Sequence, residues 1–318
     1  MDILERSYDY GTSPLTPSSY SSALHTYLFG GSHIAHSLSP QIHSTLFRSN
    51  STQWSYDLFA STSMEEFKEN IQSPTCIGAS VTMPNKVKFI AAMDEITEEA
   101  KAIGAVNTVF IRLGENGRRR YIGTNTDCIG IRDALLLKAP DAASRSRGKP
   151  ALVIGGGGAA RSAIFALWKW FAPSQIYIVN RWKDEVDAIV ADMGRQIPEA
   201  QLRHVETAES ASTLTPPVLV VGTIPNAEPG TEEEISAWKT CTTFLQQNQH
   251  GVLVDMCYFP AETRLTTLAE ANNWTTIKGA EVLVQVSKSQ QILWQERECG
   301  ASDQVEALNA VIFGSSNQ

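Results

Sequence analysis

Short apolar runs, separated by polar and turn-forming residues, recur along the chain and predict a series of strands. They lie at residues 25–29, 54–58, 76–81, 150–154, 175–179, 218–221 and 251–255. Amphipathic stretches between them predict helices, the first opening at Ser39-Pro40 and the second covering residues 64–71. Because strands that alternate with helices form parallel sheets with helices on their faces, we expect an α/β fold.

The pattern changes at residues 139–149, which are polar and rich in small residues, and we interpret this stretch as a domain linker. It separates a first α/β domain, residues 25–138, from a second series of strands and helices at residues 149–280. The second series has the βαβ succession of a Rossmann-type domain. Residues 1–24 are rich in Ser, Tyr and Thr, and we expect them to form a flexible tail.

Two smaller patterns complete the predicted elements. Arg112-Leu-Gly-Glu-Asn-Gly117 lies between two strand-like segments and predicts a hairpin loop. Amphipathic stretches at residues 281–294 and 304–313 predict two closing helices.

The composition is that of an ordinary globular protein large enough for two domains, with 318 residues, 42% of them hydrophobic and 19% charged. A formal net charge of −8 argues against a nucleic-acid-binding surface. No apolar run approaches the roughly 20 residues that span a bilayer. The N-terminus also lacks the features of a secretory signal. We therefore expect neither nucleic-acid nor membrane partners.

The five cysteines are scattered, odd in number and without CxxC spacing: Cys76, Cys128, Cys241, Cys257 and Cys299. This pattern predicts buried or free thiols in a reducing compartment, with neither a disulfide framework nor a zinc site. We expect a cytoplasmic location and no bound metal.

The first candidate for chemistry is Lys86, which follows the strand-type run at residues 76–81. Pro84 suits the first turn of a helix, so Lys86 is predicted on the opening turn of a helix that follows a strand end. Open α/β sheets bind their ligands at such junctions. A partly desolvated lysine there can exchange a proton with a hydroxyl. The alternative is an ordinary solvated lysine on the surface.

Two further strand ends present polar residues. Asn107 follows Ile103-Gly-Ala-Val106, and Asp127 follows a short strand at the start of a predicted helix. Taken alone, Asp127 is most simply a helix N-cap. Together with Thr82 and Lys86, however, these residues predict one pocket built from three strand ends.

A glycine-rich turn, Gly155-Gly-Gly-Gly158-Ala159-Ala-Arg161, directly follows the strand at residues 150–154. In this place backbone N–H groups approach a pyrophosphate, whose charge the helix N-terminus favours. The alternative, since glycine turns also serve packing alone, is a purely structural turn. The position after a strand and before a helix favours the nucleotide site.

Taken together, these motifs resemble the shikimate dehydrogenase family and occur in its order over about residues 26–297. The glycine turn is joined by Gly30-x-x-x-Ile34-x-His36-Ser37-Leu-Ser39-Pro40-x-x-His43, Ser80-Val-Thr82-x-Pro84-x-Lys86, Gly104-Ala-Val-Asn107-Thr, Asn125-Thr-Asp127-x-x-Gly130 and Asp255-Met-Cys-Tyr258-x-Pro260. The forms Val81-Thr-Met-Pro-Asn-Lys86 and Gly123-Thr-Asn-Thr-Asp127 are most similar to the fungal quinate/shikimate dehydrogenase branch.

The resemblance implies roles for individual residues. Lys86 and Asp127 would be catalytic and handle the hydroxyl proton of the substrate. Substrate binding would fall to Ser37, Ser39, Thr82, Asn107 and Tyr258. The cofactor would be bound by Gly155, Gly157, Gly158, Ala159, Asn180, Arg181, Lys183 and Thr223. The alternatives are a helix N-cap for Ser39 and a packing role for Tyr258.

The resemblance also implies the cofactor. Asn180-Arg181 at the end of the second Rossmann strand matches the family pattern for NADP, because a basic residue there accommodates the 2′-phosphate. Trp182 replaces the common Thr, and Asp184 is near enough to keep NAD as the alternative.

The C-terminal motif departs from the family pattern. Gly279-Ala-Glu281-Val-Leu-Val-Gln285-Val286 leaves Val286 where the family has a glutamine that contacts substrate hydroxyls. Gln285 lies about 100° around a helix and should not simply substitute. Val221-Gly-Thr-Ile-Pro225 also departs from the usual turn near the cofactor. Loss of a buried hydrogen-bond partner costs roughly 1–3 kcal/mol, which is enough to weaken or redirect specificity.

The resemblance therefore implies an NAD(P)-dependent oxidoreductase that interconverts a ring secondary alcohol and ketone of quinate, shikimate or a related cyclic hydroxy acid. Residues 25–138 would be the substrate-binding catalytic domain, completed by C-terminal helices at 281–318, and residues 149–280 the dinucleotide-binding domain. The protein would be a monomer or homodimer. The alternative, favoured by Val286, is a relative that senses a ligand without turnover; the intact Lys86/Asp127 pair favours the enzyme.

Overall fold

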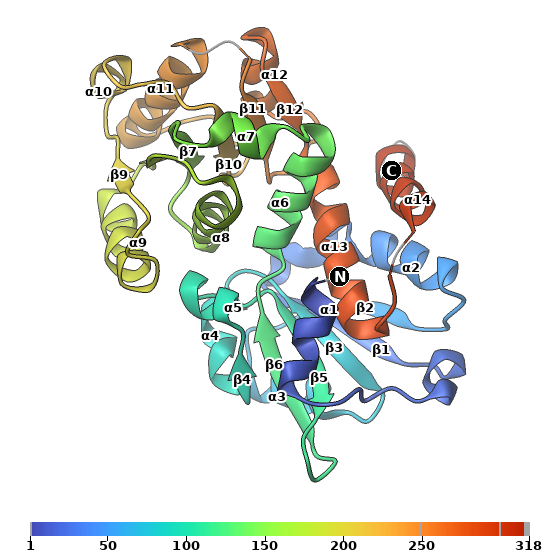
Figure 1. Ribbon diagram of the computed structural model, residues 1–318. Helices are drawn as coiled ribbons and strands as arrows, with labels where there is room; N and C mark the ends of the chain where they lie inside the picture. The colour runs from blue at the N-terminus through green and yellow to red at the C-terminus, as the bar shows by residue number, and fades with distance from the viewer. Residues whose placement is uncertain (1, 248–249, 299, 315–318) are drawn as a thin grey trace. The chain divides into compact units, whose positions relative to one another are not determined.

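The computed structural model describes residues 2–247, 250–298 and 300–314 (Figure 1). Its internal contacts divide the chain into two compact units. The first is formed by Met1–Thr126 and Val284–Gln318, and the second by Asp127–Leu283. Each unit contains one six-stranded sheet. The fold class is α/β, as predicted.

The sheet of the first unit has the strand order β2-β1-β3-β5-β6-β4. Its strands are β1 (His25–Gly30), β2 (Ser55–Ala60), β3 (Cys76–Val81), β4 (Glu95–Ile96), β5 (Thr108–Leu113) and β6 (Arg119–Thr124). Strands β1, β2 and β3 are parallel, whereas β5 is antiparallel to both β3 and β6. The predicted hairpin is thus confirmed. The expectation of a wholly parallel sheet is wrong for this unit, because the hairpin strand β5 inserts beside β3.

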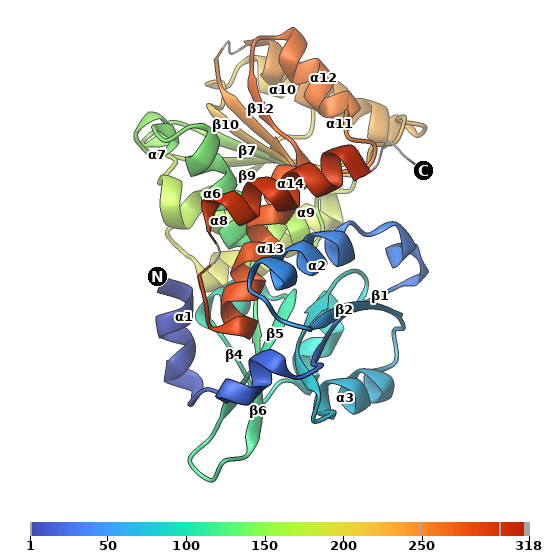
Figure 2. The ribbon, with the colours of Figure 1, turned by 90° about the vertical axis from the view of Figure 1, so that its right-hand side faces the viewer.

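Helices cover both faces of this sheet. They are α1 (Asp2–Ser7), α2 (Ser39–Ser49), α3 (Met64–Gln72), α4 (Asn85–Lys88), α5 (Glu98–Ile103), most of α13 (Gly279–Gln295) and α14 (Ala301–Gly314). On one face Phe29, Phe67 and Phe89 form an aromatic cluster. On the other, Trp294 of α13 donates its indole N–H to the Val109 carbonyl oxygen, 2.9 Å away. Helix α14 packs against α2 (Figure 2).

The N-terminal segment packs on the first unit instead of forming the expected flexible tail; of residues 1–24, Met1 lies outside the described residues. Arg112, only 1% exposed, donates to the Ser7 hydroxyl and lies 3.2 Å from a Glu296 carboxylate oxygen. Tyr20 donates to the Gln295 carbonyl oxygen at 2.9 Å and stacks on Trp54. The correction follows from these tyrosine and arginine contacts, which composition alone does not reveal.

The sheet of the second unit is wholly parallel, with the order β12-β11-β10-β7-β8-β9. Its strands are β7 (Ala151–Ile154), β8 (Ile176–Val179), β9 (Leu202–His204), β10 (Leu219–Gly222), β11 (Val252–Asp255) and β12 (Thr275–Ile277). Its helices are α6 (Asp127–Lys138), α7 (Ala142–Ser146), α8 (Gly158–Ala166), α9 (Lys183–Gln196), α10 (Ala208–Ser212), α11 (Glu232–Gln247) and α12 (Arg264–Ala271). The order of strands reverses between β7 and β10, the switch point at which doubly wound sheets bind ligands. The predicted Rossmann-type series is present.

The stretch at residues 139–149 is not a linker between the two units. It lies inside the second unit, contains α7, and is anchored by Ser146, whose buried hydroxyl donates to the Phe171 carbonyl oxygen at 2.7 Å. By its contacts, α6 also belongs to the second unit, although we had placed it in the first domain. Small and polar residues such as Ala142 and Ser146 fit a short helix as well as a linker.

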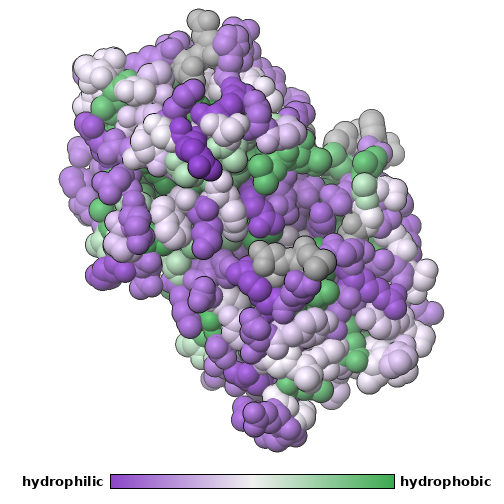
Figure 3. All heavy atoms as spheres, in the orientation of Figure 1, coloured by the Kyte–Doolittle hydropathy of each residue, from purple (hydrophilic) through white to green (hydrophobic). Residues whose placement is uncertain are grey.

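The face of the molecule in Figure 3 is largely hydrophilic, with hydrophobic residues in scattered groups. Within the described ranges, no helix has the length and apolar character needed to cross a membrane. Cys76, Cys128 and Cys241 are buried and Cys257 is half-buried, as predicted for thiols, while Cys299 lies outside the described residues.

Candidate functional site

Lys86 lies at the strand-to-helix junction predicted from the sequence. Strand β3 ends at Val81, and α4 begins at Asn85, so half-buried Lys86 is in the first turn of this helix. Backbone hydrogen bonds fix this connection. The Thr82 N–H donates to the Phe29 carbonyl oxygen at 2.9 Å, and the Val106 N–H donates to the Lys86 carbonyl oxygen at 2.9 Å. The helix has four residues and continues as a 3-10 turn, in place of the longer helix expected.

Asn107 joins the ends of three neighbouring strands of the first unit. Its carbonyl oxygen accepts from the Val81 N–H at 2.7 Å, and its own N–H donates to Thr124 at 3.1 Å. Its side-chain Oδ1 accepts from the Thr126 N–H at 2.7 Å and from the Thr108 hydroxyl at 2.8 Å. Because Asn107 is only 3% exposed, this arrangement is rigid, and it brings the predicted strand ends together.

Asp127 directly follows Thr126 and is the first residue of α6, as predicted. It is 7% exposed. A carboxylate in the first turn of a helix is favoured by the helix dipole. Contacts assign Asp127 to the second unit. The residue before it, Thr126, is held in the first unit by the hydrogen bond from its N–H to Asn107 Oδ1.

A buried hydrogen-bonded chain that sequence reasoning missed supports Asn107 from α13. Gln290 donates to the Thr108 hydroxyl at 2.9 Å, and its oxygen lies 3.0 Å from His43 Nε2. Gln291 Nε2 lies 2.9 Å from the other ring nitrogen of His43. Burial lowers the pKa of His43 to about 3, so the imidazole is neutral. The signal in the sequence is a pair of adjacent glutamines in a helix, followed directly by the apolar residues Ile292, Leu293 and Trp294.

The serine pair lies at the start of α2. Ser39 is the first helical residue and is buried, and its N–H donates to the half-buried Ser37 hydroxyl at 3.2 Å. Leu38 occupies the N-cap position without a side-chain cap, so the alternative role of Ser39 as N-cap is wrong. The two hydroxyls are neighbours at one helix N-terminus.

Tyr258 lies on the loop after β11 in the second unit and is half-buried. Buried Asp255 holds this loop, accepting from the Cys257 N–H at 3.0 Å and from the Thr263 hydroxyl at 2.6 Å. Burial raises the pKa of the Asp255 carboxyl. Gly279 is needed beside the loop, because a Cβ atom there would be 2.5 Å from the Cys257 carbonyl oxygen.

The departing C-terminal motif lies at the start of α13. Val286 is 5% exposed, and so is Gln285. Gln285 Nε2 lies 3.4 Å from the Gln304 side-chain oxygen of α14. Gln285 is thus directed to another helix, consistent with the expectation that it does not replace the missing glutamine.

The glycine turn between β7 and α8 has room for a bound group. Gly155 has φ +128°, and a Cβ atom there would be 2.2 Å from the Thr223 hydroxyl, which donates to Ile154 at 2.8 Å. At Gly157 and Gly158, by contrast, an added Cβ would meet no atom within 4 Å. Gly157 is the N-cap of α8, and half-buried Ala159 lies in its first turn. The residues present therefore fit a pyrophosphate on open backbone N–H groups.

The end of β8 lies beside this turn. Asn180 Nδ2 donates to Glu185 Oε2 at 2.7 Å, and both side chains lie within 3 Å of where a Cβ on Gly156 would be. Arg181 forms an ion pair with Glu234 of α11, and its guanidinium lies 3.8 Å from the Trp182 ring centroid.

Lys183 forms an ion pair with Asp187 at 2.7 Å, so both predicted cations at the end of β8 contact carboxylates. Sequence reasoning missed these acidic partners. The pairing of Lys183 with Asp187 could have been predicted from the sequence, because Asp187 lies one helical turn after Lys183. The pairing of Arg181 with Glu234 could not, because Glu234 is distant in the chain.

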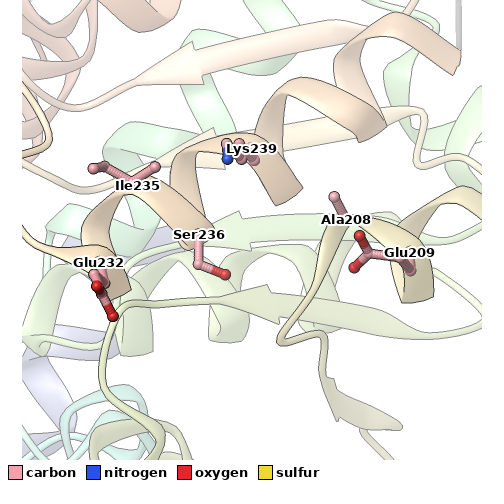
Figure 4. A pocket seen from close by; sticks show the side chains of 6 residues that line it. All are labelled: Ala208, Glu209, Glu232, Ile235, Ser236 and Lys239. Atoms are coloured by element: carbon pink, nitrogen blue, oxygen red, sulfur yellow. The ribbon is translucent and has the colours of Figure 1, made fainter.

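A separate hollow of about 320 Å³ lies between α10 and α11 (Figure 4). It is lined by Ala208, Glu209, Glu232, Ile235, Ser236 and Lys239. None of the predicted site residues lines it. Across residues 2–247, 250–298 and 300–314, no cluster of three His, Cys, Asp or Glu side chains is arranged to hold a metal ion.

Comparison with known proteins identifies relatives of this architecture. Residues 29–109 match the model of the shikimate dehydrogenase substrate binding domain. The quinate dehydrogenase of Emericella nidulans is 40% identical over 305 residues, which are 89% of this chain and 92% of that protein. The shikimate dehydrogenase (NADP(+)) of Salinibacter ruber is 31% identical over 282 residues, 88% of this chain and 95% of that protein.

A solved structure agrees with these sequence relatives. The dehydroquinate dehydratase and shikimate dehydrogenase from S. pombe superposes with a TM-score of 0.76 at 29% identity, covering 92% of this chain and 53% of that chain. With a relative 40% identical over nearly its whole length, the chain belongs to the shikimate/quinate dehydrogenase family and is an NAD(P)-dependent dehydrogenase.

Proposed function

We propose that the protein interconverts the secondary alcohol and ketone of quinate, shikimate or a closely related cyclic hydroxy acid, with Lys86 and Asp127 handling the proton. The observation that carries the proposal is Asn107, which joins the strand ends that lead to Thr82, Lys86 and Asp127. Quinate is the first substrate to test, because the Emericella relative that is named a quinate dehydrogenase is 40% identical.

In the direction of alcohol oxidation, Nζ of Lys86 accepts the hydroxyl proton as the ring carbon becomes a carbonyl. The position of Lys86 suits this role, because it directly follows the end of β3, where open α/β sheets bind their ligands. Asp127 assists by orienting the lysine and stabilising its charged form after the proton arrives. A nicotinamide dinucleotide, when bound, accepts the hydride in this direction and donates it in the other.

The remaining first-unit residues bind the substrate in this proposal. The neighbouring hydroxyls of Ser37 and Ser39, at the N-terminus of α2, bind its carboxylate, which the positive end of a helix favours. Thr82 and Asn107 bind ring hydroxyls. Tyr258 is also assigned to substrate binding.

The cofactor is assigned to the glycine turn. Gly155, Gly157, Gly158 and Ala159 hold the pyrophosphate, and Thr223 fixes the turn through Ile154. Asn180, Arg181 and Lys183 face the adenosine ribose. Because both cations contact carboxylates, we do not carry the predicted preference for NADP into the proposal.

Turnover with each pair of substrate and cofactor tests the proposal. Purified protein is mixed with quinate or shikimate and with NAD⁺ or NADP⁺, and the absorbance of the reduced nicotinamide is followed. We expect turnover with at least one pair. Silence in all four mixtures, with nucleotide binding measured separately, would sink the assignment and favour a ligand-sensing role.

Lys86→Ala tests the proton-transfer role. We expect kcat to fall by about 10²- to 10⁴-fold, the typical worth of general acid–base catalysis, while nucleotide affinity stays within about twofold. Lys88→Ala is the matched control, because Lys88 lies on the same short helix but is exposed and donates to the Thr62 carbonyl oxygen at 2.6 Å. Equal losses in the two variants would contradict a catalytic role for Lys86.

A further inference from the structure

We propose that Glu234 and Glu185 make the second unit bind NAD in preference to NADP. Glu234 does so by holding Arg181, and Glu185 by placing a carboxylate at the glycine turn. The inference rests on the proposed function, because it takes the glycine turn to be the dinucleotide site. It reverses the preference that the bare sequence pattern of Asn180-Arg181 predicts.

Glu234 is fixed before it meets Arg181. Its carboxylate accepts from the Gly230 N–H at 2.9 Å and from the Thr231 N–H at 3.2 Å. The Thr231 hydroxyl in turn accepts from the Glu234 N–H at 3.2 Å, so the two residues cap the start of α11 reciprocally. The hydrogen bond from the Gly230 N–H is the main cause that lowers the pKa of Glu234, and the hydrogen bond from Arg181 is the next. The carboxylate is therefore a permanent negative charge in a set position.

Arg181 is held from two sides. One guanidinium nitrogen forms the ion pair with Glu234, and the guanidinium plane lies over Trp182, 3.8 Å from its ring centroid. The side chain of Arg181 is 41% exposed and that of Glu234 is 26% exposed. Stacking on an aromatic face together with a carboxylate contact satisfies the two main binding modes of a guanidinium.

This arrangement penalises a 2′-phosphate. To bind one, Arg181 must leave Glu234, or the phosphate must lie beside the Glu234 carboxylate and share the same cation. Both routes weaken the binding of a 2′-phosphate. The first breaks the ion pair between Arg181 and Glu234, and the second places two negative groups at close range, where they repel each other. A 2′-hydroxyl carries no charge and requires neither change.

Glu185, four residues after Arg181 in the chain, adds a second negative group. Its Oε2 accepts from Asn180 Nδ2 at 2.7 Å and would be 2.6 Å from a Cβ on Gly156. The carboxylate thus lies between the glycine turn and the end of β8. Rossmann-type domains that bind NAD place an acid in this region to accept hydrogen bonds from the ribose hydroxyls. Lys183 is paired with Asp187 instead of with Glu185.

Binding measurements without substrate test the inference separately from turnover. The probes are NADH and NADPH, and the readout is the change in nicotinamide and protein fluorescence during titration. We expect the unaltered protein to bind NADH at least tenfold more tightly than NADPH. Glu234→Gln should strengthen NADPH binding about tenfold and change NADH binding by less than twofold, because glutamine can still accept from the helix N–H groups but does not pair with Arg181.

Glu233→Gln is the matched control. It removes the same charge from the same helical turn, but Glu233 interacts with Thr231 and its own backbone. It should leave both affinities within twofold. Glu185→Gln is the second variant, and it should weaken NADH and strengthen NADPH. Equal effects of Glu233→Gln and Glu234→Gln on NADPH would mean a bulk charge effect and would overturn the role of Glu234.

The remaining outcomes distinguish this inference from the function on which it rests. Tighter NADPH than NADH binding in the unaltered protein, with normal turnover of quinate or shikimate, would overturn only the inference. Failure of both nucleotides to bind would overturn the nucleotide site itself, and the inference with it.

Discussion

Among single residues, His43 is the one whose protonation is most directly connected to the stability of the fold. Its imidazole stacks on Tyr56, with ring centroids 4.2 Å apart, and both ring nitrogens face glutamine side chains of α13. Burial lowers its pKa to about 3. The contact with the Gln290 oxygen favours the tautomer protonated at Nε2, which leaves Nδ1 to accept from Gln291.

This residue predicts a pH dependence of folding. An unfolded histidine has a pKa of about 6.5, so between pH 6.5 and 3 the unfolded chain binds a proton that folded His43 does not. The free energy of unfolding should therefore be fully present above pH 6.5 and fall by about 1.4 kcal/mol per pH unit below it. Urea unfolding at pH 7, 6 and 5 measures the slope.

His43→Gln should be less stable at pH 7 but should show a flatter slope between pH 6.5 and 5. Replacement of the exposed His33 by Gln serves as the control and should keep the original slope. An unchanged slope in His43→Gln would show that other groups govern the acid response.

For single residues, the sequence predicts a position correctly where the local pattern of strands and helices determines it. Lys86 and Asp127 follow strand-like runs and precede helical ones, so their places at element boundaries were predictable. Glu234 was not, because it is 53 residues from Arg181 and meets it only through the tertiary fold. The predicted preference for NADP rests on Arg181 and Lys183 alone and remains a prediction; the structure adds the carboxylates of Glu234 and Asp187 beside them.

At the scale of elements, the packing of α13 on β3 depends on one glycine. A Cβ atom on Gly78 would be 2.2 Å from Trp294 Nε1 and 2.8 Å from the Val109 carbonyl oxygen, the two atoms that form the hydrogen bond there. Gly78→Ala should therefore lower the free energy of unfolding by about 1–3 kcal/mol, as expected for overpacking a core.

Gly194→Ala is the matched control for this prediction, since no atom lies within 4 Å of a Cβ there and the residue lies inside α9. It should raise stability by up to about 1 kcal/mol, because alanine favours a helix over glycine. Urea unfolding of both variants decides the matter, and a harmless Gly78→Ala would contradict the tight approach of α13.

Most elements were predictable from apolar period and length, with ends displaced by a few residues at most. The errors have a common physical cause. The stretch at residues 139–149 has the small and polar residues of a linker, and the burial of Ala142 and Ser146 distinguishes it as part of a packed helix. The two-residue strand β4 is too short to show any period.

At the scale of the whole molecule, the N-terminal segment packs against the end of α13, which is distant in the sequence. Tyr8 donates to a Glu296 carboxylate oxygen at 3.0 Å, and Tyr20 donates to the Gln295 carbonyl oxygen at 2.9 Å. Between them, buried Arg112 contacts both Ser7 and Glu296. The N-terminal segment thus packs against the core of the first unit.

Removal of residues 2–21 should lower the free energy of unfolding by roughly 3–5 kcal/mol, from lost burial of aromatic side chains and lost partners of a buried guanidinium. Chemical unfolding of the full and shortened chains measures the difference. In an Arg112→Met background the same removal should have a smaller effect. An equal effect in both backgrounds would exclude Arg112 as the point of attachment.

The family and the two-domain plan were predictable because the motifs occur in a fixed order. The domain limits were less predictable. Contacts assign α6 to the second unit, and of the C-terminal part of the chain they assign only the residues after Leu283 to the first. The first boundary lies at the start of α6, and the second lies within α13, a continuous helix.

The way the first unit is assembled from two distant segments determines when it can be completed during synthesis. The second unit is one continuous segment, Asp127–Leu283, whereas the first needs Val284–Gln318 as well as Met1–Thr126. Trp294 and Gln290 close the sheet face at Val109 and Thr108, and both leave the ribosome after the whole second unit. Since domains fold as units during translation, the second unit is finished first. The half that carries Lys86 waits, with one face of its sheet uncovered, until the last helices emerge.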